Sequence, residues 1–78
     1  MFGKELRKLR LKAGLTQEEV GVSAGVSREY VSMLESGKNI PTIDVFMRLC
    51  HAVHVYPAEV IARLDHAAQT RLSRKSTK

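Results

Sequence analysis

The sequence predicts an all-α domain built from five helices, and three observations support this prediction. Apolar residues recur at intervals of three and four positions along most of the chain, which is the helical period. Thr16, Ser27 and Thr42 each stand directly before such a segment, and these residue types cap helix N-termini well. No segment resembles a strand, and 78 residues have room for one small domain.

The first helix is expected at residues 2–13. Its apolar residues at helical spacing are Phe2, Leu6, Leu9 and Ala13. Gly14 then ends the helix, because glycine adopts the left-handed conformation that commonly follows a helix C-terminus.

The second and third helices, at residues 17–24 and 28–35, are joined by a tight turn at Gly25. Thr16 and Glu19 have the spacing of a capping box at the start of the second helix. The apolar residues that can close on one another across the turn are Val20, Ala24, Val26, Val31 and Leu34. This is the pattern of a helix-turn-helix, whose second helix is presented to the major groove of DNA.

The fourth helix follows Thr42, and the fifth begins at Pro57, because the first turn of a helix accepts proline. The apolar face of the fourth helix is expected to consist of Ile43, Phe46, Leu49, Cys50 and Val53. The apolar residues of the fifth helix are Val60, Ile61, Leu64, Ala67 and, further along, Ala68 and Leu72.

We expect two parts, a helix-turn-helix domain at residues 1–66 and an extension at residues 67–78. The extension continues the last helix and ends in a tail, SRKSTK, that has no apolar residue and is expected to be disordered from Ser73 onward. The basic residues of this end are Arg71, Arg74, Lys75 and Lys78. Their charges are equally compatible with nonspecific attraction to phosphates and with a simple solvated tail.

The charge balance suits a polyanionic partner but does not identify one. Lys and Arg number 13 against 8 Asp and Glu, which gives a formal net charge of +5. The single cysteine excludes an intramolecular disulfide, and the N-terminal segment MFGKELRKLR is charged where a signal peptide needs an apolar run. No run of apolar residues is long enough to span a membrane. We therefore expect a cytoplasmic protein that is associated with the nucleoid when it is bound to DNA.

The outward face of the expected third helix carries side chains that could read DNA. Arg28 could donate two hydrogen bonds to guanine O6 and N7, and Glu29 could accept one from cytosine N4. Met33 offers an apolar contact to a thymine methyl group, and Ser32 can donate or accept. The alternative is an ordinary solvated helix face, but the capped helix and the glycine turn before it favour a recognition helix.

These segments resemble the lambda-repressor-like, Cro/C1-type helix-turn-helix family, which is also called the XRE family. The resemblance rests on LRKLRLKAGLTQEEV, AGVSREYVSMLESGK and PTIDVFMRLCHAV, and it covers about residues 4–64. Its most specific pieces are GLTQ at residues 14–17 and LESGK at residues 34–38. The resemblance implies a five-helix domain that binds DNA.

The resemblance also implies roles for single residues. In this family a glutamine at the start of the second helix binds a phosphate and supports the recognition helix, which implies this role for Gln17. The start of a helix suits an anion because its backbone N–H groups are free. Lys38 and Asn39 resemble a second phosphate-binding position of the family, and the hydroxyl of Tyr30, at the flank of the third helix, could reach the DNA backbone. Arg28, Glu29 and Met33 resemble the residues that read bases in family members, with Ser32 as a lesser candidate.

Family members often pair an arginine late in the first helix with a glutamate at the end of the third, and Arg10 and Glu35 stand at these positions. We expect this pair to be structural and not to contact DNA. Two positions depart from the family. His54 stands where glycine is usual, so a left-handed helix end there would be mildly strained. The loop at residues 40–42 lacks the basic residue that some relatives insert into the minor groove, so we expect no such contact.

No metal, cofactor or catalytic activity is expected. Cys50, His51 and His54 are close in sequence, but a structural zinc site takes four ligands and no fourth is evident. His66 is isolated. The sequence contains no nucleophile–histidine–acid set, no phosphate-binding loop and no dinucleotide fingerprint.

We therefore expect a sequence-specific double-stranded DNA-binding protein that regulates transcription, as a repressor that covers a promoter. One module buries little DNA surface, so a homodimer on a pseudo-palindromic operator is expected. The candidate dimer residues are Val60, Ile61, Leu64 and Ala68, although this stripe could instead belong to the core. Alternatives are a restriction–modification controller protein, an antitoxin that autoregulates its operon and, in another class, a protein-interaction adaptor without DNA readout.

Overall fold

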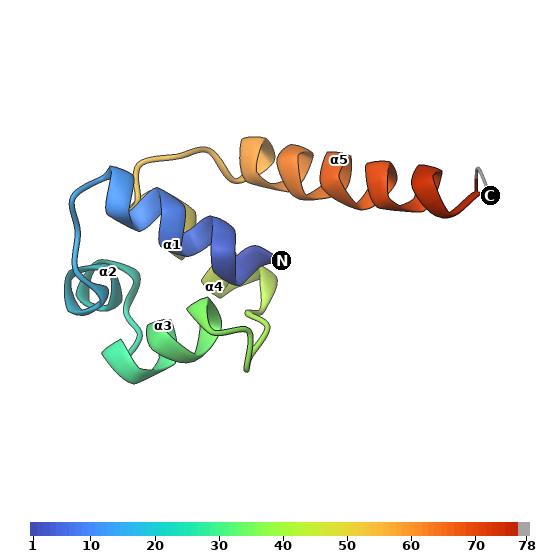
Figure 1. Ribbon diagram of the computed structural model, residues 1–78. Coiled ribbons are helices and arrows are strands. Elements are labelled where there is room, and N and C mark those ends of the chain that lie inside the picture. Colours follow the sequence, from blue (N-terminus) through green and yellow to red (C-terminus); the bar gives the residue numbers. More distant parts are fainter. Residues whose placement is uncertain (77–78) are drawn as a thin grey trace.

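The computed structural model describes the backbone of residues 1–76 and the side chains of residues 1–70. Its elements are α1 (Phe2–Lys12), α2 (Gln17–Ala24), α3 (Arg28–Glu35), α4 (Ile43–Ala52) and α5 (Pro57–Ser76), with no strand among the described residues (Figure 1). The predicted all-α fold and its five helices are therefore confirmed.

Helices α1 to α4 pack into one body, to which α5 adds its first turns through Val60, while the rest of α5 extends away (Figure 1). The molecule is 45 Å long and 23 by 22 Å across. The tail that we expect to be disordered from Ser73 onward is instead helical through Ser76. The reason is that its arginine and lysine are good helix formers and no proline or glycine follows Pro57 in α5. Residues 77–78 lie outside the described residues, as do the basic side chains of the tail.

The three predicted N-caps form. The hydroxyl of Thr16 accepts a hydrogen bond from the N–H of Glu19 at 3.0 Å, and the Glu19 side chain accepts one from the N–H of Thr16 at 2.8 Å, which completes the capping box. Ser27 and Thr42 each accept from the N–H three residues further on. Each bond satisfies a backbone donor that the first turn of a helix leaves unpaired.

Each of the helices α1 to α4 is followed by a residue in the left-handed conformation, namely Gly14, Gly25, Gly37 and His54, and the sequence predicts this for Gly14 and Gly25. Gly25 turns the chain from α2 into α3 with a φ of 76°. His54, which follows α4, has a φ of 65° although it carries a side chain. A residue with a Cβ atom pays about 1 kcal/mol in this conformation. The predicted strain at His54 is therefore present.

The core is mostly aliphatic, since the chain has no Trp and only two Phe and two Tyr residues. Its buried hydrophobic residues are Leu6, Leu9, Val20, Ala24, Val31, Leu34, Phe46, Leu49, Cys50, Ala52, Val53 and Val60. The rings of Phe2 and Phe46 meet edge to face with their centroids 5.1 Å apart. Apart from half-buried Val26, all residues predicted to close across the helix-turn-helix belong to this core.

Two expectations about apolar residues need correction, those for Val60 and Ile43. Val60, a candidate for the dimer surface, is completely buried and belongs to the core. Ile43 is 66% exposed, because it is the first residue of α4 and lies at the edge of the packed body. Ile61 is 47% exposed, since it is turned about 100° around α5 from Val60. Ala67 is also exposed.

Helices α1 and α3 cross so closely that Gly3 has no room for a side chain. A Cβ atom at this position would overlap the carbonyl oxygen of Leu34 and would lie 2.9 Å from that of Glu35. Gly21 in α2 is restricted in the same way, since a Cβ atom would lie 2.7 Å from the carbonyl oxygen of Val26. Because the obstacles are backbone atoms, they cannot turn aside as a flexible side chain could.

A hydrogen-bond network around Glu35 fastens α3 to α1 and α2. Arg10 donates from Nε and Nη2 to the two carboxylate oxygens of Glu35 at 2.7 and 3.0 Å. Gln17 donates from its amide to the same carboxylate at 3.1 Å. Arg10 also donates from Nη1 to the carbonyl oxygen of Leu15 at 3.0 Å, which holds the loop between α1 and α2.

The expected ion pair between Arg10 and Glu35 is thus present and largely shielded from water. The two side chains are only 11% and 5% exposed. The hydrogen bonds to Glu35 raise the pKa of Arg10, so the guanidinium is charged at every pH at which the protein folds. A bidentate pair of this kind fixes both distance and orientation.

Glu35→Ala should lower the free energy of unfolding by about 3 kcal/mol, because it leaves the mostly buried guanidinium of Arg10 without its partner. Urea denaturation followed by circular dichroism measures this loss. Glu5→Ala is the matched control, since it breaks a more exposed pair, Glu5 with Arg63, and should cost less than about 1 kcal/mol. Equal losses in the two variants would contradict the structural role of Glu35.

Gly3→Ala should lower the free energy of unfolding by about 2 kcal/mol, because the added methyl group forces α1 away from α3. Alanine is a better helix former than glycine, so helix propensity alone predicts that the substitution raises the free energy of unfolding. Thermal unfolding, compared with Lys8→Ala at an exposed position of the same helix, separates the two effects. A Gly3→Ala protein as stable as the Lys8→Ala control would show that the helices do not cross this closely.

Candidate nucleic-acid interface

The outward side chains of α3 form an exposed face at one edge of the domain. The four predicted base-reading residues, Arg28, Glu29, Ser32 and Met33, are all exposed. Val31 and Leu34 on the opposite side of α3 are buried, and they fix the rotation of the helix. The fold therefore brings the four candidates together on one helix face.

Arg28 and Glu29 lie close to each other but form only a weak, exposed ion pair. Nη2 of Arg28 is 3.5 Å from Oε2 of Glu29, and the side chains are 60% and 74% exposed. Water screens a pair at this exposure, so its contribution is below about 1 kcal/mol. Each side chain is free to turn to another partner.

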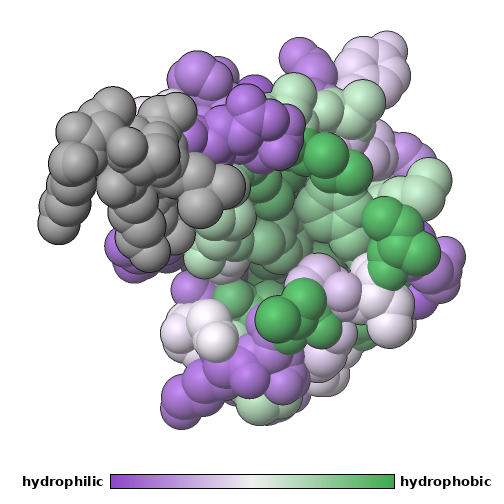
Figure 2. Space-filling model, turned by 90° about the vertical axis from the view of Figure 1, so that its right-hand side faces the viewer, coloured by the Kyte–Doolittle hydropathy of each residue, from purple (hydrophilic) through white to green (hydrophobic). Residues whose placement is uncertain are grey.

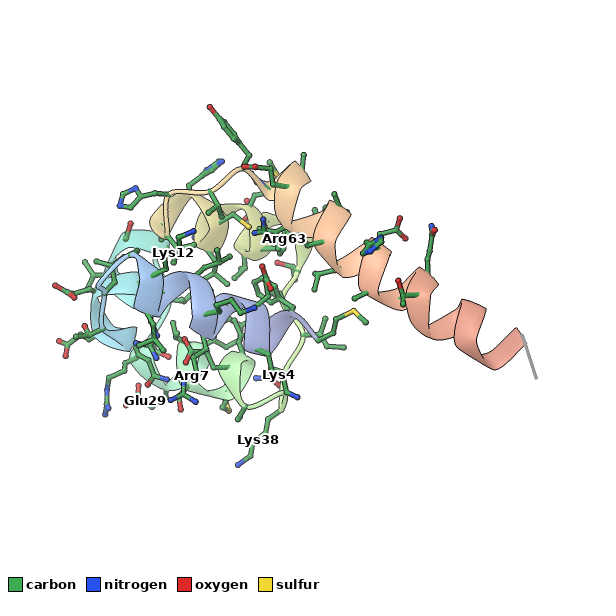
Figure 3. The ribbon with its side chains drawn as sticks, turned by 45° about the horizontal axis from the view of Figure 1, so that its top comes forward. Lys4, Arg7, Lys12, Glu29, Lys38 and Arg63 are labelled. Atoms are coloured by element: carbon green, nitrogen blue, oxygen red, sulfur yellow. The ribbon has the colours of Figure 1, made fainter. Side chains whose placement is uncertain are left out.

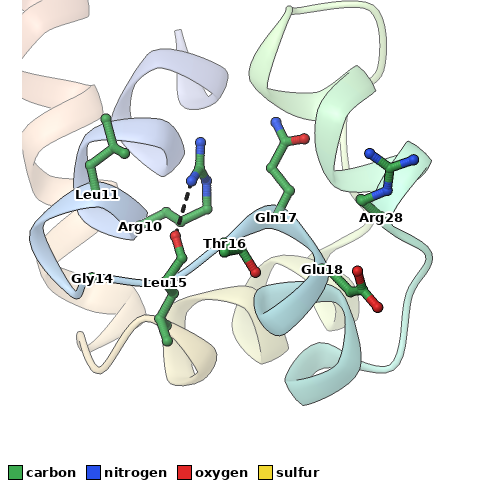
Figure 4. A pocket seen from close by; sticks show the side chains of 8 residues that line it. All are labelled: Arg10, Leu11, Gly14, Leu15, Thr16, Gln17, Glu18 and Arg28. Carbon is green, nitrogen blue, oxygen red and sulfur yellow. Dashed lines mark hydrogen bonds between the residues drawn. The ribbon is translucent and has the colours of Figure 1, made fainter.

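Gln17, the first residue of α2, lines two hollows beside α3. The first has a volume of about 650 Å³ and is also lined by Arg10 and Arg28 (Figure 4). The second has a volume of about 250 Å³ and is also lined by Ser32. An amide nitrogen carries two N–H donors, and Gln17 uses one of them on Glu35. The other remains available at the N-terminus of α2, where the free backbone N–H groups favour an anion.

The other residues predicted to contact phosphates flank α3. Tyr30 is half-buried and its ring packs against the core. Lys38 and Asn39 are exposed in the loop that follows α3. The amide nitrogen of Asn39 lies 3.9 Å from Sδ of Met33, so this loop adjoins the outward face of the helix.

The structure adds two arginines that the sequence analysis does not single out. Arg7 lines the smaller hollow together with Gln17 and Ser32, and its position one helical turn before Arg10 is the only sequence signal for this placement. Arg48 donates from Nη1 to the carbonyl oxygen of Ala24 at 3.0 Å. It therefore closes the C-terminal end of α2, a role that depends on how α4 packs and leaves no pattern in the sequence.

The basic side chains lie on different sides of the domain. In Figure 3, Lys4, Arg7 and Lys38 follow the edge that also carries Glu29, whereas Lys12 and Arg63 lie away from that edge. The positive charge of the chain is thus partly gathered beside α3.

Cys50, His51 and His54 face different surroundings. Cys50 is buried in the core, and the two histidines are exposed. Burial raises the pKa of Cys50 to about 11, so its thiol is protonated at neutral pH, whereas metals bind the thiolate. In the part of the chain that the structure describes, no three His, Cys, Asp or Glu side chains are grouped to hold a metal ion. No helix over the same residues has the length and apolar character needed to cross a membrane.

Comparisons with known proteins match this arrangement. Residues 6–60 match the helix-turn-helix family HTH_3. An uncharacterized HTH-type transcriptional regulator from Sinorhizobium fredii is 37% identical over 65 residues, which cover 83% of this chain and 84% of that protein.

Two solved structures are similar in fold. The restriction-modification controller protein C.AhdI from Aeromonas hydrophila has a TM-score of 0.73 and 34% identity, with 76% of this chain and 89% of that chain covered. The P22 c2 repressor, solved in complex with a synthetic operator, has a TM-score of 0.71 and 25% identity, with 77% and 91% covered. Together with the capped helix pair and its glycine turn, these matches show that the chain belongs to the lambda-repressor-like, Cro/C1-type (XRE) family of helix-turn-helix transcriptional regulators.

Proposed function

We propose that this protein binds specific double-stranded DNA sites by inserting α3 into the major groove, and that it represses transcription by covering a promoter. The observation that carries the proposal is the exposed face of a helix held in place by Arg10, Gln17 and Glu35. A reading helix must keep a fixed position relative to the groups that bind the backbone, because phosphate contacts set the register of base contacts. Such a protein acts in the cytoplasm, at the nucleoid.

The base-reading roles follow from the position and chemistry of each side chain. Arg28 is the first residue of α3, and recognition helices contact bases from their N-terminal part. We assign guanine to Arg28, cytosine to Glu29 and a thymine methyl group to Met33, with Ser32 as a further donor or acceptor. All four side chains are exposed, so none has to leave the core to reach a base.

The phosphate ligands would hold the backbone on both sides of α3. Gln17 approaches from the start of α2, while Lys38 and Asn39 approach from the loop after α3. The hydroxyl group of Tyr30 is a further candidate, since its ring is held against the core. A formal net charge of +5 adds general attraction to the polyanion.

We further propose that the protein binds a pseudo-palindromic operator as a homodimer. Figure 2 shows the side of the molecule from which α5 projects, and hydrophobic side chains gather on this face. On α5, Ile61 is exposed, and Leu64 and Ala68 are partly exposed. Ile40 and Ile43 are 91% and 66% exposed, which is unusual for isoleucine and adds apolar surface near the start of α4. Pairing two copies would double the DNA surface that is read.

Two other regulatory roles and one other class of function are compatible with the same domain. The similarity to C.AhdI supports a restriction–modification controller, and an autoregulating antitoxin would use the same DNA contacts. Neighbouring genes for a methyltransferase and an endonuclease would support the controller, and a small toxin gene would support the antitoxin. The adaptor is distinguished by measurements on random duplex DNA. Phosphate contacts make such binding steeply dependent on salt, and a protein-interaction adaptor would lack this salt dependence.

Selection of binding sites from random duplexes tests the proposed readout. Arg28→Ala should erase the preference at one or two base pairs of the selected site and cost about 1–3 kcal/mol on that site, because a bidentate contact to guanine is lost. Lys38→Ala is the comparison variant, since a phosphate contact positions the protein without reading sequence, and it should weaken binding to all sites alike. An unchanged consensus in Arg28→Ala would overturn the assignment of this residue.

Ile61→Asp should shift the protein from dimer to monomer, because it places a charge in the apolar surface proposed to join two copies. Sedimentation velocity at micromolar concentration measures the change. Val22→Asp is the matched control, since Val22 is 79% exposed on α2, away from α5, and the same substitution there should leave the dimer intact. A wild-type protein that sediments as a monomer at these concentrations and on DNA would contradict the dimer.

A further inference from the structure

We infer that α1 carries a further binding site for a DNA backbone phosphate, in which Arg7 is the ligand and Lys4 adds charge beside it. The inference rests on the proposed DNA binding and extends it to a helix outside the helix-turn-helix. It assigns a function to a side chain that the packing of the domain does not use.

The geometry that supports the site is the smaller hollow between three helices. Arg7 from α1, Gln17 from α2, and Ser32 and Ser36 at the end of α3 line a space of about 250 Å³. The hydroxyl of Ser36 donates to the carbonyl oxygen of Met33 at 3.1 Å, and the amide of Gln17 keeps one free N–H. Because the Ser36 hydroxyl is occupied by Met33, the donors left for a ligand are the guanidinium of Arg7, the hydroxyl of Ser32 and the free N–H of Gln17. They come from three helices and line one space beside the recognition face.

The charges around the hollow favour an anion. Glu35 also lines it, but its carboxylate accepts three hydrogen bonds from Arg10 and Gln17. Its charge is therefore neutralised before a ligand arrives. Arg7 forms no ion pair among the described side chains and is exposed. A free guanidinium with its planar fork of donors binds phosphate in a bidentate manner.

Apart from Arg10, which is bound to Glu35, the basic residues of α1 divide into two faces, and only one of these faces adjoins α3. Lys4 and Arg7 are three residues apart and lie along the edge that carries Lys38 (Figure 3). Lys8 and Lys12 instead line a separate hollow beside the loop between α4 and α5. A duplex docked on α3 would bring its backbone past the edge that carries Lys4, Arg7 and Lys38. We therefore assign a DNA phosphate, and not a free anion, to Arg7.

The division of α1 supplies a control within the same helix. We compare Arg7→Ala with Lys12→Ala, which removes the same charge from the other face, and with Arg7→Lys, which keeps the charge. Affinity is measured on the selected site and on random duplex over a range of salt concentrations. Arg7→Ala should weaken both complexes about tenfold per bound subunit, because one charged hydrogen-bonded contact is lost. The slope of log K against log salt should become shallower by about 0.9 per subunit.

The sequence preference should stay unchanged in Arg7→Ala, and Arg7→Lys should recover most of the slope. Lys12→Ala should change the slope by less than half as much, since it lies on the other face of α1. A duplex with single methylphosphonate substitutions adds a second readout, because neutralising the contacted phosphate should weaken the wild type but not Arg7→Ala. Thermal unfolding checks that the exposed substitution leaves the fold intact, and Arg7→Gln replaces Arg7→Ala if it does not.

Equal effects of Arg7→Ala and Lys12→Ala, with a wild type whose binding depends steeply on salt, would overturn the site on α1 and leave the proposed function standing. A wild type that binds duplex DNA without salt dependence would overturn the proposed function itself. A phosphate whose neutralisation weakens the wild type and Arg7→Ala alike would show that Arg7 does not contact it.

Discussion

The carboxylate of Glu35 is the point at which three helices of this domain are joined. Arg10 from α1 and Gln17 from α2 both donate to it, and it stands on the last residue of α3. Helix α3 has only eight residues, which is too short for a helix to be stable by itself. Its position therefore depends on this network at its end and on the burial of Val31 and Leu34 along its inner side.

The attachment of α3 to the rest of the domain also gives the two sides of this helix different roles. The side of the helix that faces the body is fully used by packing and by the Glu35 network, so the opposite side needs no intramolecular partner. Basic side chains of α1 and of the loop after α3 lie along the same edge. Apolar side chains gather instead where α5 leaves the body. The proposed recognition of DNA and the proposed pairing of two copies would thus use different surfaces of a domain of 78 residues.

The five helices and their order can be predicted from the sequence, because they depend on the chemistry of residues close together in the chain. The caps at Thr16, Ser27 and Thr42, the glycine turn at Gly25 and the strained helix end at His54 all involve residues close in the chain. The helical period predicted most of the core in the same way. The positions of Arg10 and Glu35 were predicted from the family resemblance, since a pair 25 residues apart has no local signal.

The way in which the helices meet is visible only in the folded molecule, because it depends on distances between segments far apart in the chain. Gly3 has no turn or cap to mark it, yet the carbonyl groups at the end of α3 leave no space for a side chain there. Val60 and Ile61 are neighbours on one apolar stretch, and the direction in which α5 leaves the body buries the first and exposes the second. Arg7 belongs to a basic helix whose two faces become distinct only once α3 lies against one of them.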